Sequence, residues 1–430
     1  MKKIKQLLKN NFIKSIILIS GGTAFAQVIN ALFSPIITRI YSPEQYGVLT
    51  VYTSILGLLV IIGSLKYEMS IPIAKSDEVA INSLALSIIV LIVFSLFTSL
   101  FLFFFSDWFL GIFNANSLKS YSYLIPIGIF LAGMYNIVMQ WAFRRKDYKS
   151  ISKTKLTQSL AQNSIKLGLG LIGLGPVGLI LGNIFGQSAG ITTLSKKLRT
   201  TDRNLFKEVK FNSVKRAAKR YKNFPLFLAP SQVLNVSGTQ LPPLLLSVLY
   251  GGSVVGFFGL ANSIVSLPMT LIGNSVADVF YGEAASVGRG NPQRIKDLYN
   301  KLLKRLFLIG LIPLIILLTL GPFLFSFVFG EEWYEAGVYS QIIAFLVFFR
   351  LIFTPISRIY AVFERQKIAF FVDSLRVIFV TIAFLVPQLL NLNSYWAIGL
   401  YSIGMSFVYF VTYLVAQKIL NEEIEKKASE

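Results

Sequence analysis

The sequence of 430 residues contains no cysteine and no histidine. The absence of cysteine excludes disulfide bonds, thiol catalysis and thiolate metal sites. The absence of histidine excludes imidazole metal ligands and histidine proton relays. Charged residues are also scarce, at 14%, whereas hydrophobic residues make up 54%. This composition favours a membrane protein, and it predicts neither a cofactor nor a metal site.

Long stretches of the chain carry no charge, and none occurs between Glu78 and Asp107. About 20 apolar residues suffice for a helix to cross roughly 30 Å of hydrocarbon. Uncharged runs of this length fit helices rather than alternating barrel strands, so an all-α integral membrane protein with twelve transmembrane helices is predicted. The predicted spans are residues 14–37, 46–65, 81–105, 121–142, 156–174, 177–195, 224–249, 254–280, 303–326, 338–357, 369–387 and 395–417.

Lysine and arginine gather on one side of these spans. The two terminal segments and every second loop, together with the span ends next to them, hold 36 of the 41 Lys and Arg residues, and the intervening loops hold only Arg39 and Lys119. Short basic loops stay in the cytoplasm, so both termini are predicted to be cytoplasmic. The net charge of +21 follows from this topology and faces anionic membrane lipids. A nucleic-acid partner is therefore not expected.

The longest polar segment, residues 196–223, lies near the middle of the chain. Its basic residues recur at helical spacing, which predicts an amphipathic helix on the inner leaflet. We interpret this segment as a basic cytoplasmic linker between an N-terminal six-helix lobe, residues 1–195, and a C-terminal six-helix lobe, residues 224–430.

The two lobes match each other at a constant offset. Tyr41, Gly47, Ser54 and Ile55 are identical to the residues 209 positions later. Both stretches join the first and second spans of their lobe in an outward loop. Six spans per lobe give the copies the same orientation, so a parallel repeat is predicted. Transporters built from such repeats bind their substrates at the repeat interface.

Three basic residues lie deep inside predicted spans, where charge is costly and usually faces a cavity or a partner. Lys166 lies about ten residues into the fifth span, close to the middle of the bilayer at the helical rise of about 1.5 Å per residue. Arg350 lies similarly deep in the tenth span, and both are predicted to face a cavity. Arg376 follows Asp373 by one helical turn, so a local ion pair and a functional role are equally supported.

Other charges lie at the cytoplasmic ends of spans. Lys66 and Glu68 end the second span, and Asp278 ends the eighth. Together with Asp373, these residues are predicted to be structural charges of a cytoplasmic gate rather than ligands. The sequence has no nucleotide-binding glycine loop and no nucleophile with a base, so transport is favoured over an enzymatic activity.

Several local patterns resemble the Wzx-type oligosaccharide flippases of the multidrug/oligosaccharidyl-lipid/polysaccharide exporter (MOP) superfamily. They are residues 39–47 (RIYSPEQYG), 66–77 (KYEMSIPIAKSD) and 255–262 (VGFFGLAN) with Leu267-Pro268. The likeness covers the whole chain. It implies a MATE-like V-shaped bundle of two six-helix lobes in the bacterial cytoplasmic (inner) membrane.

The resemblance also implies a function. A flippase of this type moves a polyprenyl-diphosphate-linked oligosaccharide from the inner to the outer leaflet for O-antigen of lipopolysaccharide, capsule or a related polymer. A polysaccharide polymerase and a chain-length regulator are then expected partners. Since desolvated phosphates need cations, we expect Lys166 and Arg350 to contact the diphosphate or acidic sugars. Arg39 and Arg376 are expected to line the outer and inner approaches.

Two alternatives belong to other classes of protein. A cation-coupled multidrug antiporter of the same superfamily would share the fold, but a cationic substrate favours carboxylates inside the bundle, and the deep charges here are basic. A membrane-embedded polysaccharide polymerase or glycosyltransferase usually presents catalytic residues on a large outward loop. The longest outward loops predicted here are only residues 106–120 and 327–337.

Overall fold

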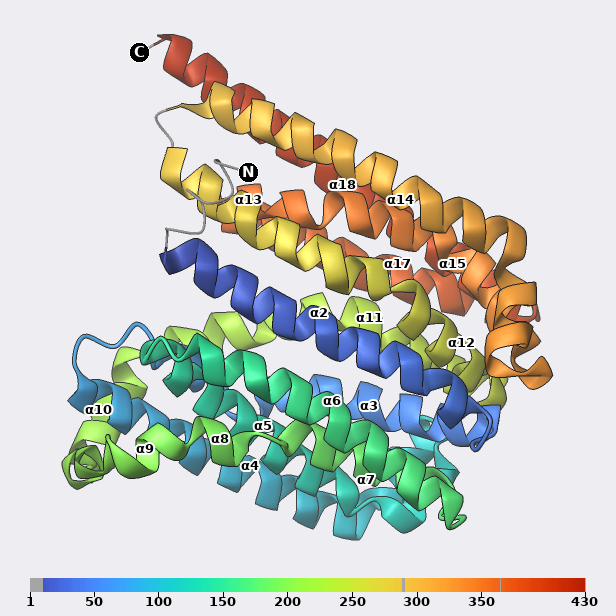
Figure 1. Ribbon diagram of the computed structural model, residues 1–430, viewed down its shortest axis with the longest axis horizontal. Coiled ribbons are helices and arrows are strands. Elements are labelled where there is room, and N and C mark those ends of the chain that lie inside the picture. The colour runs from blue at the N-terminus through green and yellow to red at the C-terminus, as the bar shows by residue number, and fades with distance from the viewer. Residues whose placement is uncertain (1–10, 288–290, 364, 430) are drawn as a thin grey trace. The chain divides into compact units, whose positions relative to one another are not determined.

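The regular secondary structure of the protein is helical, as predicted. The computed structural model describes residues 11–287, 291–363 and 365–429 (Figure 1). Contacts between residues divide the chain into two compact units, which we describe separately. The N-terminal unit is Gly21–Gly256, and the C-terminal unit is Phe257–Glu430 together with Met1–Ser20.

The N-terminal unit contains most of the first helix and six further long helices. Its elements are α2 (Asn11–Thr38), α3 (Pro43–Gly63), η1 (Tyr67–Ser70), α4 (Asp77–Ile112), η2 (Asn116–Tyr121), α5 (Leu124–Arg144), α6 (Tyr148–Leu171), α7 (Pro176–Ser188), α8 (Ile191–Leu194), α9 (Lys196–Thr200), η3 (Arg203–Glu208), α10 (Phe211–Arg220), η4 (Phe224–Leu228) and α11 (Ala229–Tyr250). Helix α12 (Gly252–Val265) begins in this unit.

The C-terminal unit contains the other long helices, of which α14 packs on α15 and α17 packs on α18. Its elements after α12 are η5 (Met269–Gly273), α13 (Asn274–Val287), α14 (Pro292–Phe329), η6 (Glu331–Trp333), α15 (Tyr334–Phe353), η7 (Pro355–Arg358), α16 (Ile359–Val362), α17 (Gln366–Leu389) and α18 (Ser394–Ser429).

Each of the twelve predicted spans overlaps one long helix or a helix continued through a short irregular segment. Within the described residues, eight helices are long and apolar enough to cross a membrane, and α12 with Met269–Ala277, bent by 41°, gives a ninth. Helices α2, α6 and α11 account for the remaining predicted spans. Of these three helices, α6 is the most polar and carries four lysines.

The faces of several long helices are apolar and exposed. On α4, Phe97, Phe103 and Phe104 are between 63% and 80% exposed, and on α14 Ile312 and Phe323 are 64% and 63% exposed. A soluble protein does not expose such continuous apolar surface, whereas acyl chains cover it favourably. These faces support the conclusion that the chain is a multi-pass membrane protein.

The start of α3 is defined by the motif Ser42-Pro-Glu-Gln. The Gln45 N–H donates to Ser42 Oγ, and the Ser42 N–H donates to Gln45 Oε1, which forms a capping box. Pro43 occupies the first turn, where its missing N–H is not needed. At the matching place in the second repeat, Gly251 has φ of +89° and turns the chain from α11 into α12.

The segments that match at an offset of 209 residues lie against each other at the starts of α3 and α12. A Cβ atom on Gly47 would lie 2.1 Å from the carbonyl oxygen of Gly252, and one on Gly256 would lie 1.8 Å from that of Pro43. Since Pro43 and Gly252 also occupy matching positions, each segment makes the same contact to the other. Contacts of this self-equivalent kind accompany two-fold symmetry. The structure therefore agrees with the predicted parallel repeat.

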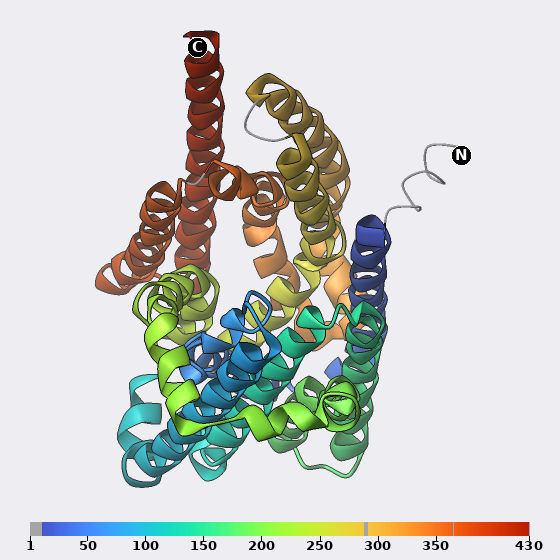
Figure 2. The same cartoon turned by 90° about the vertical axis from the view of Figure 1, so that its left-hand side faces the viewer.

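The compact units are divided at Gly256 rather than at the basic linker, because α11 packs along α3. The lobe boundaries predicted from the sequence describe repeated segments rather than contacts, and they stay a prediction. Figure 2 shows the chain from α8 through the linker to α10 running across the ends of α4 and α5.

The amphipathic helix predicted in the linker corresponds to α10. Ala217 and Tyr221 pack with Tyr67 and Leu86 in one buried cluster, so the apolar face of α10 covers η1 and α4. Its basic residues are exposed. An additional contact of this basic face with the inner leaflet stays a prediction.

Candidate functional site

A polar cavity lies within the N-terminal unit, among α3, α5, α6, α7 and α11. Its volume is ≈ 470 Å³, within the range of about 300 to 1,000 Å³ typical of small-molecule sites. Twelve described residues line it: Thr53, Leu56, Gly57, Val60, Ala132, Tyr135, Asn136, Lys155, Gln158, Asn183, Gln187 and Gln240. Five of these residues are amides, one is a lysine, and none is acidic.

The amides of α6 and α7 hold one another in place. Gln158 Nε2 donates to the carbonyl oxygen of Gln187 at 2.6 Å, and Gln187 Nε2 donates to Asn183 Oδ1 at 3.0 Å. These bonds fix the wall formed by the two helices. On the opposite side, Gly57 leaves room for Gln240, whose Nε2 would lie 3.0 Å from a Cβ at residue 57.

Lys155 is the only charged residue among the twelve described residues that line the cavity. Its Nζ lies 5.3 Å from the centroid of the Tyr135 ring, a cation–π contact, and the Tyr135 hydroxyl is hydrogen-bonded to Thr154 Oγ1 at 3.0 Å. None of the ion pairs formed between described residues involves Lys155. The cavity thus presents one cation that lacks a carboxylate partner in the described part of the chain.

Lys166, one of the residues predicted to face a cavity, lies on α6 but outside this lining. It is buried, with 6% exposed, and its stem packs where Gly182 of α7 has no side chain. The Tyr41 hydroxyl donates to its carbonyl oxygen at 2.7 Å. Arg39 follows the end of α2 and is exposed. Contact of these two cations with a substrate stays a prediction.

Arg350 and Arg376 both lie in the C-terminal unit, on α15 and α17. Arg376 Nη1 lies 3.3 Å from Asp373 Oδ1, and its guanidinium carbon is 5.3 Å from the ring centroid of Tyr409. Its Nε is buried and has no hydrogen-bond partner among the described residues. The ion pair allowed by the spacing is therefore present, and it leaves one donor of the guanidinium unused.

The predicted gate charges fall in separate places. Lys66 Nζ lies 3.7 Å from Glu68 Oε1, and Ser64 Oγ donates to Glu68 Oε2 at 2.5 Å. Both contacts lie just after α3, since Ser64 is its C-cap residue. Asp373 forms the ion pair with Arg376 described above. The side chain of Asp278, on α13, lies outside the described residues. A gating role of these residues stays a prediction.

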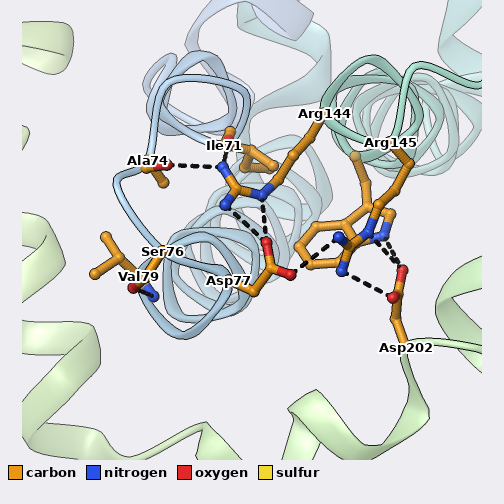
Figure 3. Close-up of polar contacts among 9 residues, drawn as sticks. Ile71, Ala74, Ser76, Asp77, Val79, Arg144, Arg145 and Asp202 are labelled. Atoms are coloured by element: carbon orange, nitrogen blue, oxygen red, sulfur yellow. Dashed lines mark hydrogen bonds and ion pairs between the residues drawn. The ribbon is translucent and has the colours of Figure 1, made fainter.

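A charged network joins the start of α4, the end of α5 and the linker (Figure 3). Arg144 donates through Nη2 and Nε to Asp77 at 2.7 and 2.9 Å. Arg145 bridges Asp77 and Asp202, with Nη1 2.9 Å from Asp77 Oδ2 and Nη2 2.8 Å from Asp202 Oδ1. The Trp141 indole N–H also donates to Asp202 at 3.0 Å. This network ties α4, α5 and the linker together, and sequence reasoning did not identify it.

Asp147 adds a second tie between α6 and the linker through Lys197, whose Nζ lies 3.0 Å from Asp147 Oδ2. Burial of the Asp147 carboxyl favours a raised pKa, but hydrogen bonds from Lys197 and Ser150 outweigh burial and lower this pKa.

The cavity amides were also missed by sequence reasoning, which followed charge alone. A signal was available, because Asn183 and Gln187 are four residues apart within one predicted span, and Asn136 and Gln240 lie inside two others. Amides at helical spacing share one face, and polar groups inside a membrane need a partner or a cavity.

Comparison with known proteins assigns the chain to a family and a fold. A family model described as "Polysaccharide biosynthesis protein" matches residues 36–338. The teichuronic acid biosynthesis protein TuaB of Bacillus subtilis (strain 168) is 26% identical over 159 residues, which are 37% of this chain and 33% of that protein. The match thus spans about a third of the length of this curated relative.

Solved transporter structures share the fold. An inward-facing multidrug resistance MATE family transporter of the MOP superfamily aligns with a TM-score of 0.76 at 13% identity, over 93% of this chain and 96% of its own. The lipid II flippase MurJ aligns with a TM-score of 0.69 at 15% identity, over 94% of this chain and 87% of its own. A MOP superfamily transporter from Pyrococcus furiosus, with a binding pocket of reverse polarity, aligns with a TM-score of 0.64 at 15% identity, over 97% and 98% of the two chains.

The all-α fold predicted from the sequence is therefore confirmed as that of MATE transporters. The solved structures that share this fold include transporters and a lipid II flippase. The matched segment covers well over half of the sequence, and the chain belongs to the polysaccharide biosynthesis protein family.

Proposed function

We propose that the protein is a flippase that moves a polyprenyl-diphosphate-linked oligosaccharide repeat unit from the cytoplasmic to the outer leaflet of a bacterial cytoplasmic membrane. The family supports a place in polysaccharide biosynthesis, and MurJ shows that this fold can carry a lipid II flippase. The distribution of Lys and Arg supports an orientation with both termini in the cytoplasm.

The observation that carries this proposal is the chemistry of the polar cavity. A multidrug antiporter that takes cationic substrates favours carboxylates in its binding site, but the described residues of the cavity lining include five amides, one lysine and no acidic residue. Amides both donate and accept hydrogen bonds, as sugar hydroxyls do. The cavity therefore fits a glycan better than a hydrophobic cation.

The diphosphate needs cations elsewhere, because a lipid diphosphate carries at least two negative charges that lose water on entering the protein. Arg350 and Arg376 supply guanidinium groups, which bind phosphate in bidentate geometry. The unused Nε of Arg376 is a donor suited to this task. Lys166, and Arg39 on the outer approach, are further cations that we assign to the substrate path.

We propose that transport proceeds by alternating access, with the lipid tail remaining in the bilayer while the headgroup passes through the protein. A polysaccharide polymerase and a chain-length regulator are the proposed downstream partners, since a translocated repeat unit has to be polymerised. O-antigen, capsule and related exopolysaccharides are the polymers considered, with undecaprenyl diphosphate as the lipid carrier.

Reconstitution tests this proposal. Purified protein is placed in liposomes that contain a synthetic fluorescent polyprenyl-diphosphate disaccharide, and the fraction of probe exposed to an external quencher is followed. We expect the protein to accelerate exchange of the probe between leaflets, and Arg350→Met with Arg376→Met to slow it about tenfold, as loss of a charge-assisted hydrogen bond predicts. Unaccelerated exchange, with ethidium transported instead, would favour the multidrug antiporter.

A further inference from the structure

We infer that the polar cavity of the N-terminal unit binds the glycan and that Lys155 selects repeat units containing an acidic sugar. This inference rests on the proposed function, and it names the substrate class of the site. It extends that function by separating the recognition of the sugar from the recognition of the diphosphate.

Hydrogen-bonding capacity in the cavity points to a sugar. Asn136 and Gln240 line the cavity from α5 and α11, and their side chains make no hydrogen bond to another described residue. Gln158, Asn183 and Gln187 are held by their mutual bonds but retain further capacity, because each amide offers two N–H donors and a carbonyl oxygen. A ligand with several hydroxyl groups satisfies such a wall, and an apolar ligand does not.

The charge of the cavity points to one carboxylate. Lys155 is half-buried, lies over the Tyr135 ring and has no acidic partner within the described ranges. A diphosphate brings two or more negative charges, which one ammonium group would leave undercompensated. A uronic acid brings one negative charge together with hydroxyl groups, and it matches one lysine surrounded by amides. The relative TuaB is a teichuronic acid biosynthesis protein, which agrees with the inference.

The position of Lys155 separates it from ordinary surface lysines. Lys153, two residues earlier on α6, is exposed and does not line the cavity. Residues two apart on a helix do not share a face. The chain therefore provides a matched control on the same helix, with the same change of charge.

The experiment compares two synthetic polyprenyl-diphosphate glycolipids that differ only at C6 of the terminal sugar, one ending in glucuronic acid and one in glucose. Leaflet exchange of each is measured in liposomes with wild-type protein, Lys155→Met, Lys155→Arg and Lys153→Met. We expect wild-type protein and Lys153→Met to prefer the glucuronosyl lipid about tenfold, the factor of one charge-assisted hydrogen bond. Lys155→Met abolishes the preference and Lys155→Arg retains it.

Two results of the leaflet-exchange assay would overturn the inference. An unchanged preference in Lys155→Met removes the role of this lysine, and an equal loss of both substrates in Lys155→Met assigns it to the diphosphate or to the fold. The thermal unfolding temperature in the presence of the soluble glucuronosyl disaccharide provides a readout that does not depend on flipping. Stabilisation by the disaccharide that requires Lys155, in protein that moves neither lipid, would uphold the glycan site and contradict the flippase. Absence of both this stabilisation and the substrate preference would overturn the inference.

Discussion

Ser253 Oγ donates a hydrogen bond to Glu44 Oε1 at 3.2 Å, and these two residues occupy the same position in the two repeats, 209 residues apart. The contact joins the N-termini of α3 and α12, where Gly47 and Gly256 bring the two backbones together. Equivalent positions meet in this way when two copies pack across a two-fold axis.

Substitutions of these glycines test the close approach. Gly47→Ala or Gly256→Ala places a methyl group against a backbone carbonyl that no rotamer change can move, so we expect each to destabilise the protein by about 1–3 kcal/mol. Gly252→Ala is the matched control, since a Cβ there meets nothing within 4 Å. Thermal unfolding of the purified protein provides the measurement, and equal midpoints for Gly256→Ala and Gly252→Ala would contradict the packing described.

The charged network at the basic end of the N-terminal unit predicts a second stability effect. Asp202→Ala removes one of the two carboxylates that the Arg145 guanidinium contacts and the acceptor of the Trp141 indole N–H, which should cost roughly 1–3 kcal/mol. Asp107→Ala is the control, because its pair with Lys119 is largely solvated, with the Asp107 side chain 83% exposed. Similar unfolding midpoints for the two variants would show that the network does not stabilise the fold.

The predicted substrate path is tested by charge removal in cells. Lys166→Met, Arg350→Met and Arg376→Met should each reduce surface polysaccharide at normal expression, because a desolvated diphosphate loses a compensating cation. Arg294→Met, an exposed position on α14, should leave the polymer unchanged. Full polymer export by both Lys166→Met and Arg350→Met would refute their assignment to the substrate path.

The absence of native cysteine makes the topology directly measurable. Lys119→Cys, in the loop before α5, should react with a membrane-impermeant maleimide added to intact cells. Lys207→Cys, in the linker, should react only after the membrane is opened. The Lys119 side chain is 38% exposed, and Lys207 is exposed. Labelling of the unaltered chain provides the background. Labelling of Lys207→Cys in intact cells would reverse the predicted orientation.

The sequence predicted the fold better than it predicted the site, for a physical reason. Hydropathy and the asymmetry of Lys and Arg are local signals, so each span could be placed without knowledge of its neighbours. A cavity depends on which faces of five helices converge. Lys155 lies near the basic end of α6, among lysines that look topogenic, and only the packing of α5 and α7 around it distinguishes it from Lys153.

The depth of Lys166 in its span could be read from the sequence, but its surroundings could not. Its depth in the span indicated that it leaves water, and the structure places it at 6% exposed. That Gly182 of α7 would accommodate its stem depends on the register between two helices. The Asp373–Arg376 pair, by contrast, follows from spacing on one helix and was predictable.

The most direct test of the flippase is the leaflet in which lipid-linked repeat units reside in cells that lack the protein. Spheroplasts and inverted membrane vesicles from such cells are treated with a membrane-impermeant periodate–hydrazide label for the glycan. We expect repeat units to accumulate and to be labelled only in inverted vesicles. The wild-type gene should reverse this accumulation, and the Arg350→Met, Arg376→Met double variant should not. Repeat units labelled on the outer face of spheroplasts at the normal level would contradict the proposed flippase.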